Sequence, residues 1–257
     1  EAVRAVDGGH DHGGAGGRVP GRAGGHPGPH APPWAPNPAR QSEVPATPGP
    51  PPDAPAVALN VTVTDTSTAS HLTIWPNGQS RPAVSSLNWA TGWTLPNAVT
   101  AKVGTNGRIN VYNSTGSTNV IIDVVGYYTA AGGAGFHPIT PERIADSRPD
   151  PVFQTGPFST PWGAGTTRNL PVTGVAGVPA DAVAVLGNVT ITSTTAPSFL
   201  TIWPNGETRP QASSLNWATG WTLPNAITTK VGTNGQLRIF NNSGSAHVLL
   251  DLAGWFG

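Results

Sequence analysis

The sequence predicts an all-β protein: two tandem β-sandwich or barrel-like domains that arise from an internal duplication and follow an extended Gly/Pro-rich N-terminal arm. Three observations support this prediction. At a shift of 128 residues, residues 60–128 align with residues 188–256 without a gap, and 42 of the 69 aligned pairs are identical. Short runs of alternating apolar and polar residues recur in each copy, with Gly-containing turn clusters between them. No segment has helical periodicity.

Residues 1–55 are predicted to form the extended arm. Gly, Pro, Ala and His dominate this segment, a composition that buries too little apolar surface to fold alone. His10, Asp11 and His12, with His26 and His30, are of the types that bind transition metals. A Gly-rich segment imposes no ligand geometry on them, so we expect no metal site here.

Residues 56–128 are predicted to form the first β domain. In residues 58–64, Leu59, Val61 and Val63 point one way and polar residues the other, which indicates a half-buried strand. Asn106 and Gly107 accept positive φ, so we expect a hairpin across them. Short strands at this spacing indicate a sandwich or barrel. The further strands are predicted at residues 71–75, 84–89, 98–103, 108–112 and 119–125.

Residues 129–135 are predicted to form a Gly/Ala linker, and residues 136–257 the second β domain with its own preceding segment. The preceding segment includes an apolar stretch at residues 168–175, and residues 178–181 lead into the repeat. Both are expected to belong to the second domain.

Five motifs in the second copy carry a family resemblance: TPxRxxDSR, LNVTxT, WPxG with RP and SxLN, PN with KVG, and DVxGYY, here at residues 140–148, 188–192, 203–216, 224–235 and 251–256. With them the chain resembles a repeat common in exported proteins of actinobacteria and related phyla. The resemblance covers nearly everything after residue 55 and implies an extracellular β module with no attached activity. Nothing in residues 1–55 matches TPxRxxDSR, so we expect the first domain to be incomplete and the arm to complete a sheet of a neighbouring subunit.

Composition excludes several classes of function. Charged residues make up 10% of the chain, and 13 Lys and Arg balance 13 Asp and Glu, so no basic surface is expected for nucleic acid. The longest apolar run, residues 120–125, is interrupted by Asp123 and is too short to span a membrane. The absence of Cys excludes disulfides and thiolate chemistry. A chain without Met that begins at Glu1 suits a mature product, so we expect a secreted, extracellular or cell-surface protein.

Tryptophan supplies the most conspicuous candidate contact residues. Exposed indole rings stack on sugars or anchor interfaces, but Trp also packs in cores and turns. The sequence leaves core packing, subunit contacts and glycan binding open. The six that recur in both copies are Trp75, Trp89, Trp93, Trp203, Trp217 and Trp221.

Asp123 and Asp251 lie among apolar residues in the last strand of each copy, where a carboxylate needs a cationic partner. We expect structural ion pairs with Lys102 and Lys230, with Arg81 and Arg209 as the alternative partners. No other acid is common to both copies, and no Gly-x-Ser-x-Gly elbow is present. The sequence therefore predicts no catalytic residues, no cofactor and no metal.

The prediction for function is an extracellular structural protein that is not an enzyme. It would be a subunit of a surface fibre, pilus-like filament or lattice, a homo-oligomer or polymer assembled through arm exchange and β-domain contacts. The alternative is a tandem carbohydrate-binding module that attaches to cell-wall or environmental glycan through its Trp residues. A third reading is an accessory repeat of an enzyme whose catalytic domain lies elsewhere; the end of the chain at Gly257, directly after the last strand, counts against it.

Overall fold

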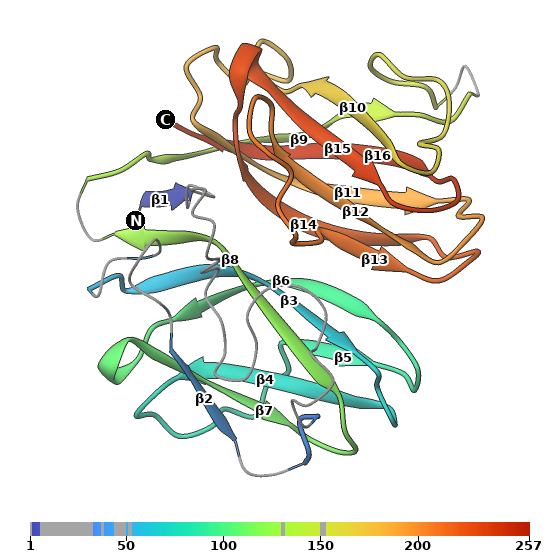
Figure 1. The fold of residues 1–257 in the computed structure, drawn as a ribbon. Coiled ribbons are helices and arrows are strands. Elements are labelled where there is room, and N and C mark those ends of the chain that lie inside the picture. The colour runs from blue at the N-terminus through green and yellow to red at the C-terminus, as the bar shows by residue number, and fades with distance from the viewer. Residues whose placement is uncertain are drawn as a thin grey trace. The chain divides into compact units, whose positions relative to one another are not determined.

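The structure, a computed structural model, describes residues 2–5, 33–36, 39–43, 50, 53–129, 132–149 and 153–257. These residues form sixteen β-strands and two short 3-10 turns, so the all-β prediction is confirmed. Contacts divide the chain into a first unit, Val3–Gly132, and a second unit, Gly133–Gly257 (Figure 1). The division falls within residues 129–135, the predicted linker.

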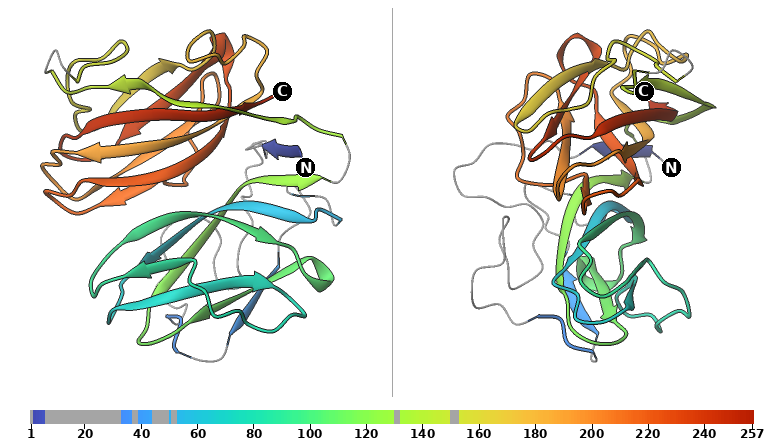
Figure 2. Two further views of the ribbon diagram at one scale, coloured as in Figure 1. Left: turned by 180° about the vertical axis from the view of Figure 1, so that it is seen from behind. Right: turned by 90° about the vertical axis from the view of Figure 1, so that its right-hand side faces the viewer.

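The first unit contains two four-stranded sheets, in the orders β1-β8-β3-β6 and β2-β7-β4-β5. The two sheets lie face to face (Figure 2). Apolar residues such as Leu59, Leu72 and Ile109 are buried and form the core. The strands are β1 (Ala2–Ala5), β2 (Arg40–Glu43), β3 (Ala56–Thr64), β4 (Ser70–Pro76), β5 (Leu87–Trp89), β6 (Leu95–Lys102), β7 (Arg108–Asn113) and β8 (Asn119–Thr129).

The second unit has the same architecture, with sheets in the orders β14-β11-β16-β9 and β10-β15-β12-β13. Its buried core includes Trp162, Leu200, Leu237 and Leu250. The strands are β9 (Phe136–Asp146), β10 (Thr166–Pro171), β11 (Ala184–Thr192), β12 (Ser198–Pro204), β13 (Leu215–Trp217), β14 (Leu223–Lys230), β15 (Gln236–Asn241) and β16 (His247–Phe256).

Strand pairing in the two units follows the same register at an offset of 128 residues. In β3 and β8, Asn60 lies opposite Asp123, and in β11 and β16, Asn188 lies opposite Asp251. Both pairings have an irregularity at the matching place, between Ala58 and Leu59 in the first unit and between Leu186 and Gly187 in the second. The repeat in the sequence therefore corresponds to a repeat of pairings.

The predicted hairpin at Asn106 and Gly107 is wrong, although both residues have positive φ as expected, 60° and 67°. They lie in the 3-10 turn Thr105–Gly107, which leads from β6 to β7. β6 pairs with β3, and β7 pairs with β4 in the other sheet. The turn therefore carries the chain from one sheet to the other. β6 and β7 belong to opposite sheets of the sandwich and do not pair as a hairpin, because their apolar sides pack against each other's sheet in the core.

The prediction of a half-buried strand at residues 58–64 is also wrong in part. In β3 both faces are buried, and the polar residues Asn60 and Thr62 are buried together with Val61. In β11 the expected alternation is present, and Asn188 and Thr190 are partly exposed. Strands with the same alternating pattern are therefore buried on both faces in the first unit and on one face in the second.

Candidate functional site

The described part of the predicted arm belongs to the first unit's own sandwich. β2 pairs antiparallel with β7, with Arg40 opposite Val111. Trp34 is only 7% exposed, and its backbone N and O bond Thr118. The Nδ2 of Asn113 donates to the Trp34 carbonyl at 3.0 Å, and the Arg40 guanidinium lies 5.0 Å from the centre of the Trp34 ring. These residues therefore complete a sheet and a core within the same chain.

The second unit holds its equivalent segment in the same way. Trp162 is fully buried, and Nδ2 of Asn241 donates to its carbonyl at 2.9 Å. The Arg168 guanidinium lies 4.6 Å from the Trp162 ring centre and donates to the Pro161 carbonyl at 2.8 Å. In the first unit Arg40 donates to the carbonyl of Pro33 in the matching way.

The alignment of the two copies begins at Asn60, so it did not include the match between residues 33–40 and residues 161–168. The signal was present, since the same shift of 128 residues pairs Pro33, Trp34 and Arg40 with Pro161, Trp162 and Arg168. Too few identities surround these positions for them to stand out. The contacts described above are what make them recognisable as one unit of structure.

The TPERIADSR segment closes one sheet edge of the second unit. Most of it lies in the eleven-residue β9, which pairs with β16. Arg143 forms a two-point ion pair with Asp251, with N–O distances of 2.8 Å and 3.1 Å. The buried Asp146 accepts bonds from Arg148 and Arg143. Burial opposes ionisation of Asp146, but the hydrogen bonds and charges of these arginines outweigh it and lower the pKa of the carboxyl.

The predicted partner of Asp251 is therefore wrong. Arg143 holds Asp251, whereas Lys230 lies beside Glu207, 4.0 Å away, and Arg209 stacks on Phe240. The reason is the pairing of β9 with β16, which puts Arg143 directly opposite Asp251. Sequence reasoning missed Arg143 because 108 residues separate it from its partner.

The corresponding edge of the first unit differs. We define the β8 edge as the side of β8 that faces away from β3; among the described residues it lies beside the four-residue β1. Asp123 sits in β8 at the position of Asp251, and none of the side chains that the structure describes, Lys102 and Arg81 included, forms a hydrogen bond or ion pair with it. Burial raises the pKa of Asp123 to about 6. The β8 edge thus carries a desolvated carboxylate, Asp123, that no described Lys or Arg side chain neutralises.

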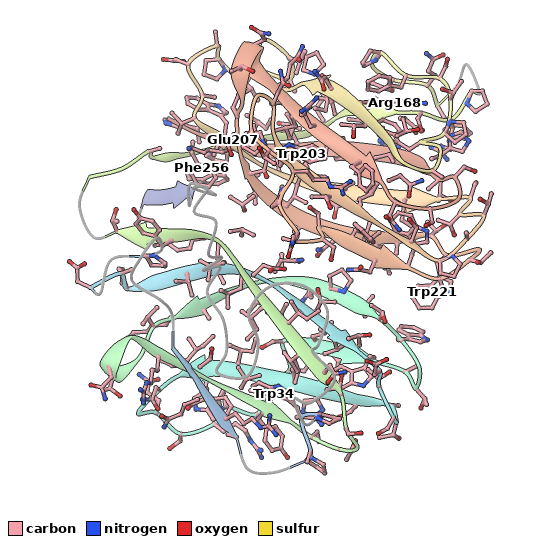
Figure 3. All side chains as sticks on the ribbon, viewed as in Figure 1. Trp34, Arg168, Trp203, Glu207, Trp221 and Phe256 are labelled. Atoms are coloured by element: carbon pink, nitrogen blue, oxygen red, sulfur yellow. The ribbon has the colours of Figure 1, made fainter. Side chains whose placement is uncertain are left out.

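Four of the six candidate Trp residues are buried, and each indole N–H donates to a backbone carbonyl of a nearby loop. Trp75 bonds Gln79 at 3.0 Å. Trp203 bonds Glu207 at 3.0 Å, and both of these residues are labelled in Figure 3. Their placement fits the core and turn packing that the sequence left open. The other two that are buried, Trp89 and Trp217, bond Thr68 at 3.0 Å and Ala196 at 3.1 Å.

Trp93 and Trp221 lie in turns and keep surface accessible to a partner. Trp93 is 37% exposed, and Trp221 is partly buried at the edge of the second core. Each follows a Gly with positive φ, Gly92 or Gly220. Of the six candidates, these two are the ones with side-chain surface that can contact an interface or a sugar.

The described residues contain neither a group of metal ligands nor a membrane-spanning helix. No group of three or more His, Asp or Glu side chains there is arranged to hold a metal ion. The His-containing segment at residues 10–30 lies outside the described residues. No helix in the described ranges is long and apolar enough to cross a membrane.

Comparison with known proteins does not identify the chain. No model of a known protein family matches it, and no curated protein is significantly similar.

Proposed function

We propose that this protein is an extracellular structural subunit of the exported β-repeat type, which self-assembles without catalysis by strand addition at the β8 edge. The single observation that carries the proposal is Asp123. Its counterpart Asp251 pairs with Arg143 of β9, the strand beside β16. No cationic side chain that the structure describes pairs with Asp123. An Arg-bearing strand added at the β8 edge supplies both backbone hydrogen bonds and the missing charge.

The N-terminal segment of a second copy is the strand that fits this edge. Arg4 and Asp7 have the same spacing in the sequence as Arg143 and Asp146. Arg4 lies in β1, whose backbone already occupies the place beside β8 that β9 occupies beside β16. The same pairing made between chains joins one protomer to the next.

The length of chain between the two N-terminal strands permits exchange. The 27 residues from 6 to 32 connect β1 to Pro33, and a chain of this length spans at most about 100 Å. Pro33 and Trp34 are anchored in their own sandwich, so the exchanged part is the strand before them. Assembly therefore leaves the core of each protomer intact.

Deletion of residues 1–32 tests the proposal, because it removes β1 and keeps Trp34 and β2. We expect the full chain to form fibres or a lattice in electron micrographs and the truncated chain to remain monomeric in light scattering. Arg4→Asp and Asp123→Arg should each abolish assembly, and the double variant should restore it through the reversed ion pair. Arg18→Asp, the same charge change outside β1, is the control. Assembly of the truncated chain, or a full chain that stays monomeric, would contradict the proposal.

Exposure of Trp93 supports a second candidate function, glycan binding by the two turn tryptophans. We expect Trp93→Ala and Trp221→Ala together to abolish binding on a glycan array, because stacking area is lost in both units. Circular dichroism should remain unchanged. Retention of the same glycan signal by the double variant would exclude these residues as the contact.

A further inference from the structure

A polar depression of about 420 Å³ lies on the outer face of the first unit's β2-β7-β4-β5 sheet. β4 contributes His71 to its lining, β7 contributes Tyr112, and the segment between β4 and β5 contributes Arg81. Asn88 and Ser114 complete the part of the lining used below. The depression is open to solvent, and its volume lies within the range of ligand sites.

Arg81 gives this depression a positive charge, and its guanidinium is stacked on the ring of Tyr112. Its guanidinium lies 3.7 Å from the centre of the Tyr112 ring, and its side chain is exposed. No Asp or Glu lines the depression, and no described carboxylate forms an ion pair with Arg81. A guanidinium held in this way presents several N–H donors in one plane, which matches the geometry of a carboxylate.

The groups around Arg81 are suited to hydroxyls. Asn88 donates to Ser85 Oγ at 2.9 Å, which fixes the amide. Its amide oxygen has no partner within the described residues, and neither do the hydroxyls of Tyr112 and Ser114. A sugar ring carries hydroxyls that bond donors and acceptors of these kinds.

The second unit provides an internal comparison. There Arg209 lies at the same 3.7 Å over Phe240, so the stacked arginine is common to both units. Phe199 replaces His71, and Phe240 replaces Tyr112. The ring pairs have similar spacing, 6.5 Å in the first unit and 6.2 Å in the second. The stacked arginine and the ring pair therefore form in both units. Only in the first unit do the rings, His71 and Tyr112, carry polar atoms.

We infer that the depression in the first unit binds a carboxylate-bearing sugar, a uronic acid residue of an acidic polysaccharide. Arg81 donates two hydrogen bonds to the sugar carboxylate, while Tyr112 and Asn88 bond ring hydroxyls. The open shape admits one residue of a chain whose neighbours continue into solvent. This inference does not depend on self-assembly through the β8 edge.

The test is calorimetric titration of the full chain with an oligogalacturonate, beside the same oligosaccharide with its carboxyls reduced. We expect binding to the acidic form that weakens with salt, and at least tenfold weaker binding to the neutral form. Arg81→Gln should weaken binding at least tenfold, and Arg209→Gln, the matched change in the second unit, should leave it unchanged.

A double variant keeps the test valid if a single change disturbs folding. His71→Phe with Tyr112→Phe installs the ring pair that the second unit carries, so the fold is retained and circular dichroism should not change. We expect this variant to lose at least tenfold in affinity. Absence of binding to the oligogalacturonate at millimolar concentration, equal binding of the neutral form, or equal loss in Arg209→Gln would each overturn the inference.

Discussion

Replacing Trp34 by alanine is expected to lower the free energy of unfolding of the first unit by about 3 to 5 kcal/mol, the usual cost of deleting a buried Trp side chain. The ring is 7% exposed and packs under Arg40, and the Trp34 backbone joins the loop before β8 through Thr118. Loss of the ring leaves a cavity and frees the segment that carries β2. Hydrogen exchange measured by mass spectrometry should show the loss in peptides of the first unit.

Trp93→Ala is the control for this change, because it deletes the same side chain at a 37% exposed turn. We expect a cost of at most about 1 kcal/mol there. Trp162→Ala should reproduce the effect of Trp34→Ala in the second unit, since both residues accept a hydrogen bond from an Asn side chain at their carbonyl and lie beside an Arg guanidinium. Equal stability of Trp34→Ala and the parent would mean that residues 33–43 do not pack on the first sandwich in solution.

Asp123→Asn is expected to stabilise the dilute, monomeric protein at neutral pH and to have little effect at pH 4. Burial raises the folded-state pKa of Asp123 to about 6, above the unfolded value of 3.8. The folded state therefore binds the proton more tightly, and its stability falls as pH rises from about 4 to about 6. This difference in pKa corresponds to at most about 3 kcal/mol. Thermal melts between pH 4 and 8 measure it, and Asp123→Asn should flatten the profile.

Asp251→Asn provides the matched comparison at the same position of the second unit. Asp251 is held by Arg143, so the substitution removes a partly exposed ion pair and should cost about 1 kcal/mol at neutral pH. Opposite signs at the two positions are the expected result. The same sign at both would mean that Asp123 has a cation near it in the monomer, which would remove the main support for strand addition between chains.

Local sequence predicted the features that depend on neighbouring residues. The alternation of Leu59, Val61 and Val63 places β3, and the turn residues Asn106 and Gly107 have the positive φ that their types favour. The beginnings and ends of strands were less accurate. The strand predicted at residues 98–103 begins at Leu95, because Pro96 is tolerated opposite Thr62 in β6, the edge strand of its sheet.

The candidate site was predicted less well than the fold, because its contacts join distant parts of the chain. Arg143 and Asp251 meet only because β9 adds beside β16. Trp75 and Trp203 are conspicuous in the sequence but are buried, and their indole N–H groups donate to loop carbonyls. Trp34 looked like part of a Pro-rich arm, yet it is buried by β7 and the loop before β8.

The sequence alone determined that this protein is all-β, that its pattern repeats at 128 residues, and where its turns lie, because alternation and turn chemistry act over a few residues. Only the tertiary structure decided which strands are neighbours, that the segment containing Trp34 completes its own sandwich, and that Asp251 pairs with Arg143. Pairing and burial depend on which distant faces exclude water together, and a local pattern does not encode the partner.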